Sequence, residues 1–324
     1  IWLIHILCWF GAELILRIWP FPPLPTEYEM LLEYQWGKLE HIAGRGILLV
    51  GDSSLGNAVA APIVASKLGM PVVNAALTGS HATYGDYLVV KRAIERGRDW
   101  RAIIVFHTPS VWSWKPNRDS AQSLDAAFEV HSLANYSYWL ANRSALIGAS
   151  TSTRRWLVLS MRFGFDRERI LQYKARLERV GRRLPELDYI EQNSKIDPQN
   201  YVPSNLEEFR PTAYADEWLD ALIRLCRAHS VPVFLATGPL PESEVRISRR
   251  YLEDMFVWLR AKADQNQGVE VLYTSVPAAP LRFFGDSSSH LNNEAQSAFS
   301  RWFAAVLSRG MKGGGEAPAS PWWR

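Results

Sequence analysis

The chain has 324 residues, with 36 lysines and arginines against 33 aspartates and glutamates, and a formal net charge of +3. Hydrophobic residues make up 48% and charged residues 21%, a globular composition that excludes a disordered or fibrous protein. A charge so near neutral gives no argument for nucleic acid as a partner.

The two cysteines, Cys8 and Cys226, lack metal-ligand spacing. We expect no disulfide between them, because Cys8 lies in an apolar terminal segment and Cys226 in a predicted helix.

Residues 1–19 are mostly apolar over nearly the length of about 20 residues that a membrane span needs. Four prolines between positions 20 and 25 then predict a short stiff linker. We therefore expect residues 1–25 to be a membrane anchor and linker, with the rest of the chain outside the cytoplasm, periplasmic or otherwise extracytoplasmic. The alternative is a buried amphipathic helix in which Glu13 and Arg17, one turn apart, pair on a solvated face.

Short apolar runs alternate with helical stretches from Gly46 onward. The runs predicted as strands are 47–50, 70–74, 100–106, 231–237 and 269–273. The predicted helices are 55–68, near 84–97, 214–229, 247–264 and 292–308. Short strands separated by helices favour a parallel sheet with helices on both faces. We expect this α/β domain to cover residues 26–310 and to be followed by a flexible tail at 311–324, which shows no periodicity.

Residues from about 111 to 210 interrupt this regularity and are rich in arginine mixed with apolar residues. One interpretation is a basic amphipathic element that rests on an anionic membrane or contacts an acidic polymer. We prefer the other, a mainly helical insertion with a solvated charged face.

The segment with the clearest chemical pattern is Gly51-Asp52-Ser53-Ser54, directly after the first predicted strand and at the start of a helix. A serine at such a junction has its hydroxyl at the carboxyl edge of the sheet, where open α/β sheets bind ligands. The helix N-terminus directs unpaired backbone N–H groups at negative charge, which acyl transfer through an oxyanion requires. The alternative is a helix cap formed by Asp52 or Ser53, and we expect Asp52 to be a structural hydrogen-bonding partner.

A second segment, just before the last predicted helix, contains Asp286, His290, Leu291 and Asn292. A loop histidine with a nearby carboxylate suits a general base, because the imidazole takes the serine proton and the carboxylate stabilises the imidazolium.

With these two segments the sequence resembles the SGNH/GDSL hydrolase superfamily over roughly residues 46–110 and 214–308. The resemblance implies Ser53 as the nucleophile, His290 and Asp286 as its catalytic partners, and the backbone N–H groups of Ser53 and Gly79 in the oxyanion hole. It also implies a three-layer, flavodoxin-like α/β/α sandwich and no metal or organic cofactor.

The sequence departs from the family pattern at two places. The family aspartate usually stands three residues before the histidine, where this chain has Ser287, while Asp286 stands four before it. A hydrogen bond between Asp286 and His290 therefore needs a slightly different loop, and a Ser–His dyad assisted by a backbone carbonyl is the alternative. The third block of the family normally supplies an oxyanion-hole asparagine, but the segment after the third predicted strand has none. His107, Thr108 or Ser110 is a candidate replacement, or the hole relies on backbone amides alone.

The altered third block, the His-Leu-Asn sequence and the apolar N-terminus are similar to the membrane-tethered branch of the superfamily, which includes proteins resembling alginate O-acetylation factors and the D-alanine transfer protein of teichoic acid synthesis. This implies a serine esterase or acyltransferase that acts on O-acyl groups of a cell-envelope carbohydrate, beside a membrane-bound acyltransferase. We expect the acyl group to be acetyl. The alternatives are a non-catalytic scaffold or glycan-binding protein on the same fold, and a general lipid esterase.

Overall fold

The computed structural model describes residues 27–40, 42, 45–97, 99–114, 195–314 and 323. From residue 31 on, these belong to one compact unit. The expected anchor and linker, most of the expected insertion and most of the expected tail lie outside the described residues. Within the described ranges, no helix is both long and apolar enough to cross a membrane.

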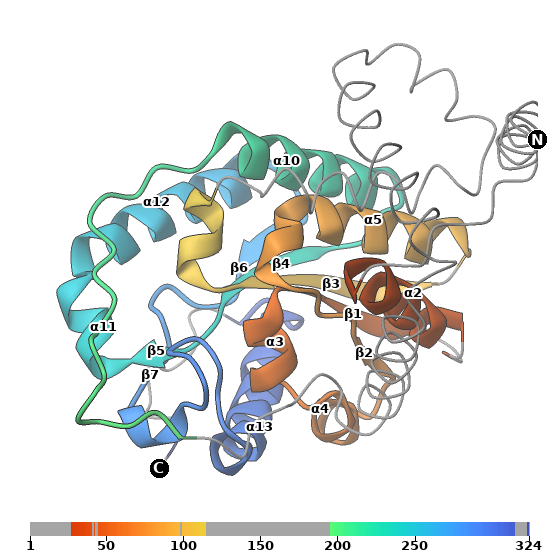
Figure 1. Cartoon of the computed structure of the whole chain (residues 1–324). Coiled ribbons are helices and arrows are strands. Elements are labelled where there is room, and N and C mark those ends of the chain that lie inside the picture. Colours follow the sequence, from red (N-terminus) through yellow and green to blue (C-terminus); the bar gives the residue numbers. More distant parts are fainter. Residues whose placement is uncertain are drawn as a thin grey trace, which may run out of the picture. The chain divides into compact units, whose positions relative to one another are not determined.

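The centre of the fold is a five-stranded parallel sheet (Figure 1). Its strands are β1 (Gly46–Gly51), β2 (Val72–Asn74), β3 (Trp100–His107), β4 (Val233–Thr237) and β6 (Val269–Val271). They lie side by side in the order β2-β1-β3-β4-β6. This is a doubly wound order, in which the chain turns in opposite directions after β1 and after β3, so that ligands are expected at the carboxyl edge between these two strands. The expected parallel α/β sheet is therefore confirmed.

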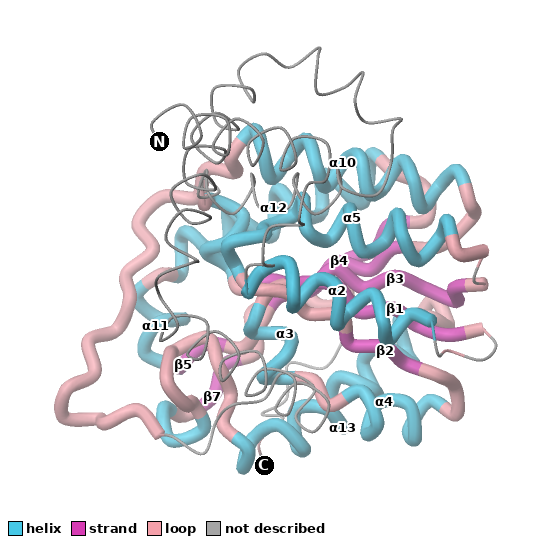
Figure 2. Tube along the Cα trace, turned by 45° about the vertical axis from the view of Figure 1, so that its right-hand side comes forward, coloured by secondary structure: helices cyan, strands magenta, loops and turns pink. Residues whose placement is uncertain are grey.

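Helices cover both faces of this sheet (Figures 1 and 2). One face carries α5 (Ala82–Glu95), α10 (Ala213–Ala228) and α12 (Arg249–Gln265), and the other carries α3 (Ser53–Ala58), α4 (Ala61–Leu68) and α13 (Asn293–Gly310). The smaller elements are α2 (Glu27–Glu40), α11 (Glu242–Ile247), the strand pair β5 (Leu240–Pro241) and β7 (Ala278–Ala279), and the 3-10 helices η1 (Gly79–His81), η2 (Pro109–Ser113) and η3 (Leu281–Phe283).

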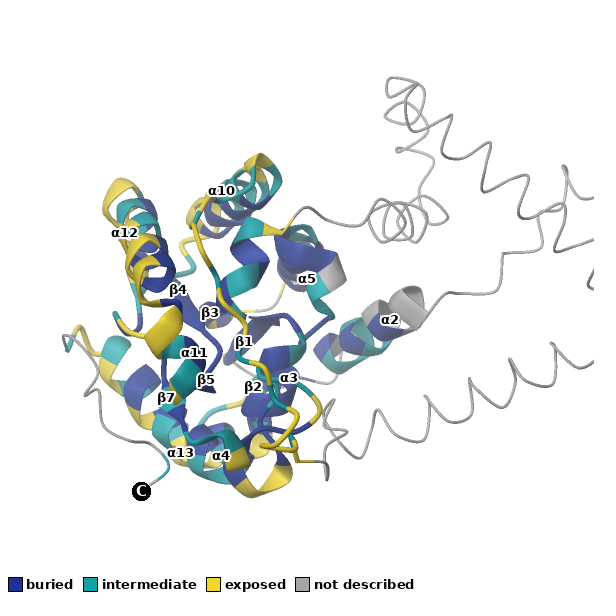
Figure 3. Ribbon diagram, turned by 60° about the vertical axis from the view of Figure 1, so that its left-hand side comes forward, coloured by how far each residue is buried: buried dark blue, intermediate teal, exposed yellow. Residues whose placement is uncertain are grey.

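Strands β1 and β4 are buried along their whole length, and β3 is buried from Ala102 onward (Figure 3). Because successive strand side chains point to opposite faces, Ile47 and Leu49 of β1 join the core under α13, where Phe299 and Phe303 pack edge-on against Phe106 of β3. This core fixes α13, and the loop that leads into it, against the sheet.

Most predicted elements are confirmed within a few residues, with one correction. The single helix expected over 55–68 is two helices, α3 and α4, with a break at Val59 and Ala60. Pro62 explains the break, because its ring lacks an N–H and clashes with the carbonyl four residues earlier in a continuous helix.

The described end of the expected helical insertion, residues 195–210, contains no helix. Instead, this segment is attached to α11, where the buried Glu244 carboxylate accepts hydrogen bonds from the Tyr201 hydroxyl (2.6 Å) and the Ser204 backbone N–H (3.0 Å).

Candidate active site

The turn between β1 and α3 places Ser53 at the carboxyl edge of the sheet. Gly51 ends β1 so close to β3 that a Cβ atom there would lie 1.7 Å from the Phe106 carbonyl oxygen. Asp52 is the N-cap of α3, and its Oδ1 accepts the Ser54 backbone N–H at 2.8 Å, so Ser53 is the first residue of the helix. Asp52 is thus the structural hydrogen-bonding partner expected from the sequence.

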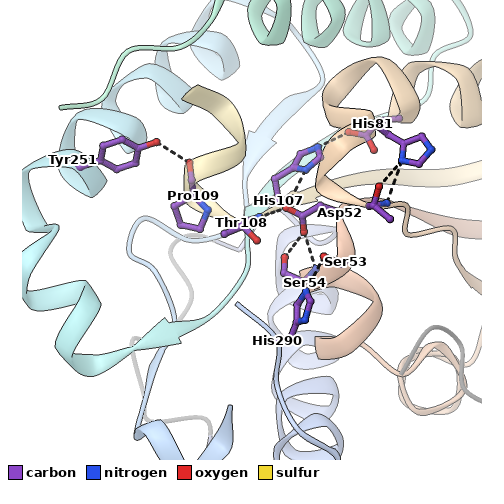
Figure 4. Close-up of polar contacts among 11 residues, drawn as sticks. Asp52, Ser53, Ser54, His81, His107, Thr108, Pro109, Tyr251 and His290 are labelled. Carbon is purple, nitrogen blue, oxygen red and sulfur yellow. Dashed lines mark hydrogen bonds and ion pairs between the residues drawn. The ribbon is translucent and has the colours of Figure 1, made fainter. Parts of the chain in front are cut away.

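The loop before α13 brings His290 to Ser53 (Figure 4). Its Nε2 lies 2.8 Å from the Ser53 Oγ. The loop is held at both ends: the Gly285 N–H donates to the His290 carbonyl at 2.8 Å, and Phe284 and Leu291 form an antiparallel bridge. The imidazole is therefore presented by a short closed loop anchored to the core helix α13.

Asp286 completes a line of three side chains. Its Oδ1 lies 2.7 Å from the His290 Nδ1. When Nδ1 carries the ring proton and donates it to Asp286, the Nε2 lone pair accepts the Ser53 hydroxyl proton, the arrangement of a serine nucleophile with its base and orienting acid. Asp286 is 49% exposed and His290 17% exposed, so solvent reaches the carboxylate end of the line more than the imidazole.

Gly79 lies at the same edge of the sheet. The chain after β2 continues beside β1, with the Leu77 N–H donating to the Gly51 carbonyl at 2.8 Å, so Gly79 and Ser53 each follow two residues after this contact. Gly79 begins η1 as Ser53 begins α3, and backbone N–H groups at these positions have no partner within their helices. Gly79 does not have the positive φ angle that would by itself favour glycine. A Cβ atom at this position would, however, lie only 3.0 Å from the Trp114 ring.

His107 is placed differently from its expected role in the oxyanion hole. The fully buried ring contacts Asp86 of α5 through Nε2 (2.5 Å to Oδ2), and its Nδ1 lies 3.6 Å from the Asp52 Oδ2. The Thr108 N–H donates to the same Asp52 oxygen at 2.8 Å. Since two carboxylates occupy both sides of the imidazole, His107 does not fit as an oxyanion donor, and this expectation is corrected.

Asp86 is the residue that the sequence reasoning missed. It lies on the buried face of α5 between Ala82 and Val90, where the neighbouring positions are apolar. A carboxylate within such an apolar stripe must have a partner, which is the signal that would have drawn attention to it.

Comparisons with protein-family models, with curated proteins and with solved structures find no match. The fold and the site geometry by themselves define the class: a doubly wound α/β protein in which a serine, a histidine and an aspartate side chain are joined by two successive hydrogen bonds. Among the described residues, no group of three or more His, Cys, Asp or Glu side chains is placed to hold a metal ion.

Proposed function

We propose that the protein is a serine esterase or acyltransferase of the SGNH/GDSL type. The observation that carries this proposal is the line from Ser53 through His290 to Asp286, with distances of 2.8 and 2.7 Å. A hydroxyl polarised by an imidazole, which is itself oriented by a carboxylate, is the arrangement that activates serine for attack on an acyl carbonyl.

In the proposed reaction the Ser53 oxygen attacks the ester carbonyl as its proton passes to His290. The backbone N–H groups of Ser53 and Gly79 stabilise the oxyanion. When the tetrahedral intermediate collapses, the alcohol leaves with the proton from His290 and the acyl group stays on Ser53. Water or a sugar hydroxyl then attacks the acyl-enzyme while His290 takes its proton. The bond between the acyl group and the Ser53 oxygen breaks as His290 returns that proton to Ser53, which completes hydrolysis or transfer and restores the free serine.

For the substrate we propose O-acyl groups, acetyl in the first place, on a cell-envelope carbohydrate, with a membrane-bound acyltransferase as partner. This part rests on the sequence resemblance to the membrane-tethered branch and not on the geometry of the site. The missing third-block asparagine is the observation that favours a non-catalytic scaffold instead.

A fluorophosphonate probe tests the catalytic proposal. We expect one equivalent to label wild-type protein at Ser53 and none to label Ser53→Ala. The exposed helical serine Ser66 is the matched control, since Ser66→Ala should label as wild type does. Absence of labelling in wild-type protein would support the scaffold.

Substrate class is tested by incubating the protein with an acetylated and with a deacetylated envelope glycan. Acetate release from the first supports the esterase, and acetyl uptake by the second from a soluble donor supports the transferase. Faster turnover of long-chain p-nitrophenyl esters than of the acetate would favour a lipid esterase.

A further inference from the structure

Three ionisable side chains meet below the turn that carries Ser53. They are Asp52, His107 and Asp86, which come from the start of α3, the end of β3 and the middle of α5. Each is at most 2% exposed. Figure 4 shows His107 beside Asp52 on the side of the turn away from His290. None of the three belongs to the Ser53–His290–Asp286 line, so their cluster needs an explanation of its own.

Asp52 is the connecting member of this cluster. Its Oδ1 accepts from the Ser54 N–H (2.8 Å) and the Ser54 hydroxyl (2.5 Å), while its Oδ2 accepts from the Thr108 N–H (2.8 Å). The first two bonds hold the beginning of α3, and the third ties it to the end of β3. Because Ser53 stands between Asp52 and Ser54, any shift of this carboxylate moves the nucleophile as well.

A carboxylate with almost no solvent contact is costly unless positive charge or hydrogen bonds compensate it. His107 is the basic side chain that the structure places beside it. Asp86 holds the ring at Nε2, which leaves Nδ1 facing Asp52. Two uncharged residues also adjoin His107: Trp112 of η2 lies edge-on to its ring with centroids 4.9 Å apart, and Thr237 is its backbone neighbour on β4.

We propose that His107 and Asp86 are positioning residues for the Ser53 nucleophile: Asp86 orients a protonated His107, which holds the Asp52 carboxylate and thereby the start of α3 at the distance from which His290 reaches Ser53. This inference rests on the proposed function. It also gives the altered third block a role, since the end of β3 supplies His107 and the Thr108 N–H to Asp52 in place of an asparagine amide to the oxyanion.

The electrostatics of the cluster agree with this assignment. Burial disfavours the imidazolium, but the nearby charges of Asp86 and Asp52, together with the hydrogen bond to Asp86, outweigh it and raise the pKa of His107 to about 10. Burial likewise opposes ionisation of Asp52, yet His107 and the bonds from Ser54 and Thr108 hold the pKa of this carboxyl below its usual value. Burial dominates at Asp86 and raises its pKa. His107 is therefore protonated and Asp52 ionised at neutral pH.

The test compares His107→Gln and Asp86→Asn with wild-type protein in fluorophosphonate labelling and in p-nitrophenyl acetate turnover, both normalised to folded protein. The matched control is His229→Gln, which changes an exposed histidine at the end of α10. We expect kcat and the labelling rate to fall by about 10- to 100-fold in His107→Gln, with KM changed less than about threefold, because the nucleophile is displaced while substrate contacts remain. Asp86→Asn should show the same kcat-specific loss to a smaller extent.

A second measurement on wild-type protein uses ¹⁵N NMR of the histidine rings. His107 should keep both ring protons from pH 6 to pH 9. A neutral His107 at pH 7, or wild-type labelling rates in both folded variants, would overturn the inference, and the NMR result decides if neither variant folds. Failure of the proposed function looks different, because wild-type protein itself would then not react with the probe.

Discussion

The Ser53 Oγ lies 2.8 Å from the His290 Nε2, although 237 positions of sequence separate the two residues. Two features of the fold produce this contact. Ser53 follows the central strand β1, and His290 precedes α13, which packs on α3 and α4 against the same face of the sheet. The short loop that enters α13 therefore ends beside the turn that leaves β1.

The first prediction concerns these two residues. Ser53→Ala removes the nucleophile and His290→Ala removes its base, so each should lower kcat for p-nitrophenyl acetate by more than about 10⁴-fold. Both side chains lie at the rim of the fold, outside the apolar core, so the far-ultraviolet circular dichroism spectrum should stay unchanged. Turnover at the wild-type rate in either folded variant would refute the proposed mechanism.

The second prediction decides which residue orients His290. Asp286→Asn leaves a side chain of the same shape but offers Nδ1 an amide that does not stabilise the imidazolium, so kcat should fall by about 10²- to 10³-fold. We expect less than the loss in Ser53→Ala because the carboxylate is half exposed and water partly replaces it. Ser287→Ala is the control, since Ser287 occupies the usual family spacing but makes its side-chain contact with Ser289. A greater loss in Ser287→Ala than in Asp286→Asn would overturn the assignment.

The sheet and this line of side chains were predictable from the sequence because their signals are local. A short apolar run that ends in Gly51-Asp52-Ser53 indicates both a strand and a serine at its carboxyl edge. Asp286 and His290 stand in one loop, so a hydrogen bond between them needs only a tight turn. What the sequence left open was whether a spacing of four residues permits it, and the 2.7 Å contact answers that for this chain.

The cluster below the turn was not predictable in the same way. His107 and Asp86 lie on different elements, 21 positions apart, and they face each other only because α5 crosses the sheet over β1 and β3. The sequence suggested His107 as an oxyanion donor from its place after a strand. It could not reveal the side of the sheet to which the imidazole points, because that depends on the register of β3.

The third prediction is a pH dependence of stability. The pKa of His107 rises from an ordinary value of 6.5 to about 10 on folding, so the folded protein binds one more proton than the unfolded chain between these values. This stabilisation is complete below pH 6.5 and is lost as the pH rises through 10. The free energy of unfolding should therefore fall from pH 7.5 to 8.5 by about 1.4 kcal/mol through this group.

Urea denaturation of wild-type protein and of Asp86→Asn measures this effect. The variant removes the largest cause of the raised pKa, so its free energy of unfolding should fall less steeply over the same range. The buried Cys226 thiol, whose pKa burial raises to about 12, loses its own stabilisation only as the pH passes the ordinary value of 9.0, so an upper limit of pH 8.5 keeps its contribution small. A wild-type free energy of unfolding that does not fall over this range would contradict a protonated His107.

The fourth prediction concerns the close approach of β1 and β3 that sets the position of Asp52 and Ser53. In Gly51→Ala the new methyl group would lie 1.7 Å from the Phe106 carbonyl oxygen, so the strands must separate at the point where the nucleophile turn begins. The free energy of unfolding should drop by more than about 4 kcal/mol, and fluorophosphonate labelling should be lost even at temperatures where folded protein remains.

Gly69→Ala is the matched control, because Gly69 ends α4 with φ near +67° and a methyl group there meets no atom within 4 Å. That substitution carries only the backbone cost of an L-residue in the left-handed conformation, about 1–2 kcal/mol, and labelling should continue at the wild-type rate. If Gly51→Ala instead unfolded at the same urea concentration as Gly69→Ala, β1 and β3 would not approach as closely as the structure has them. The position of Ser53 would then need another explanation than the contact between Gly51 and Phe106.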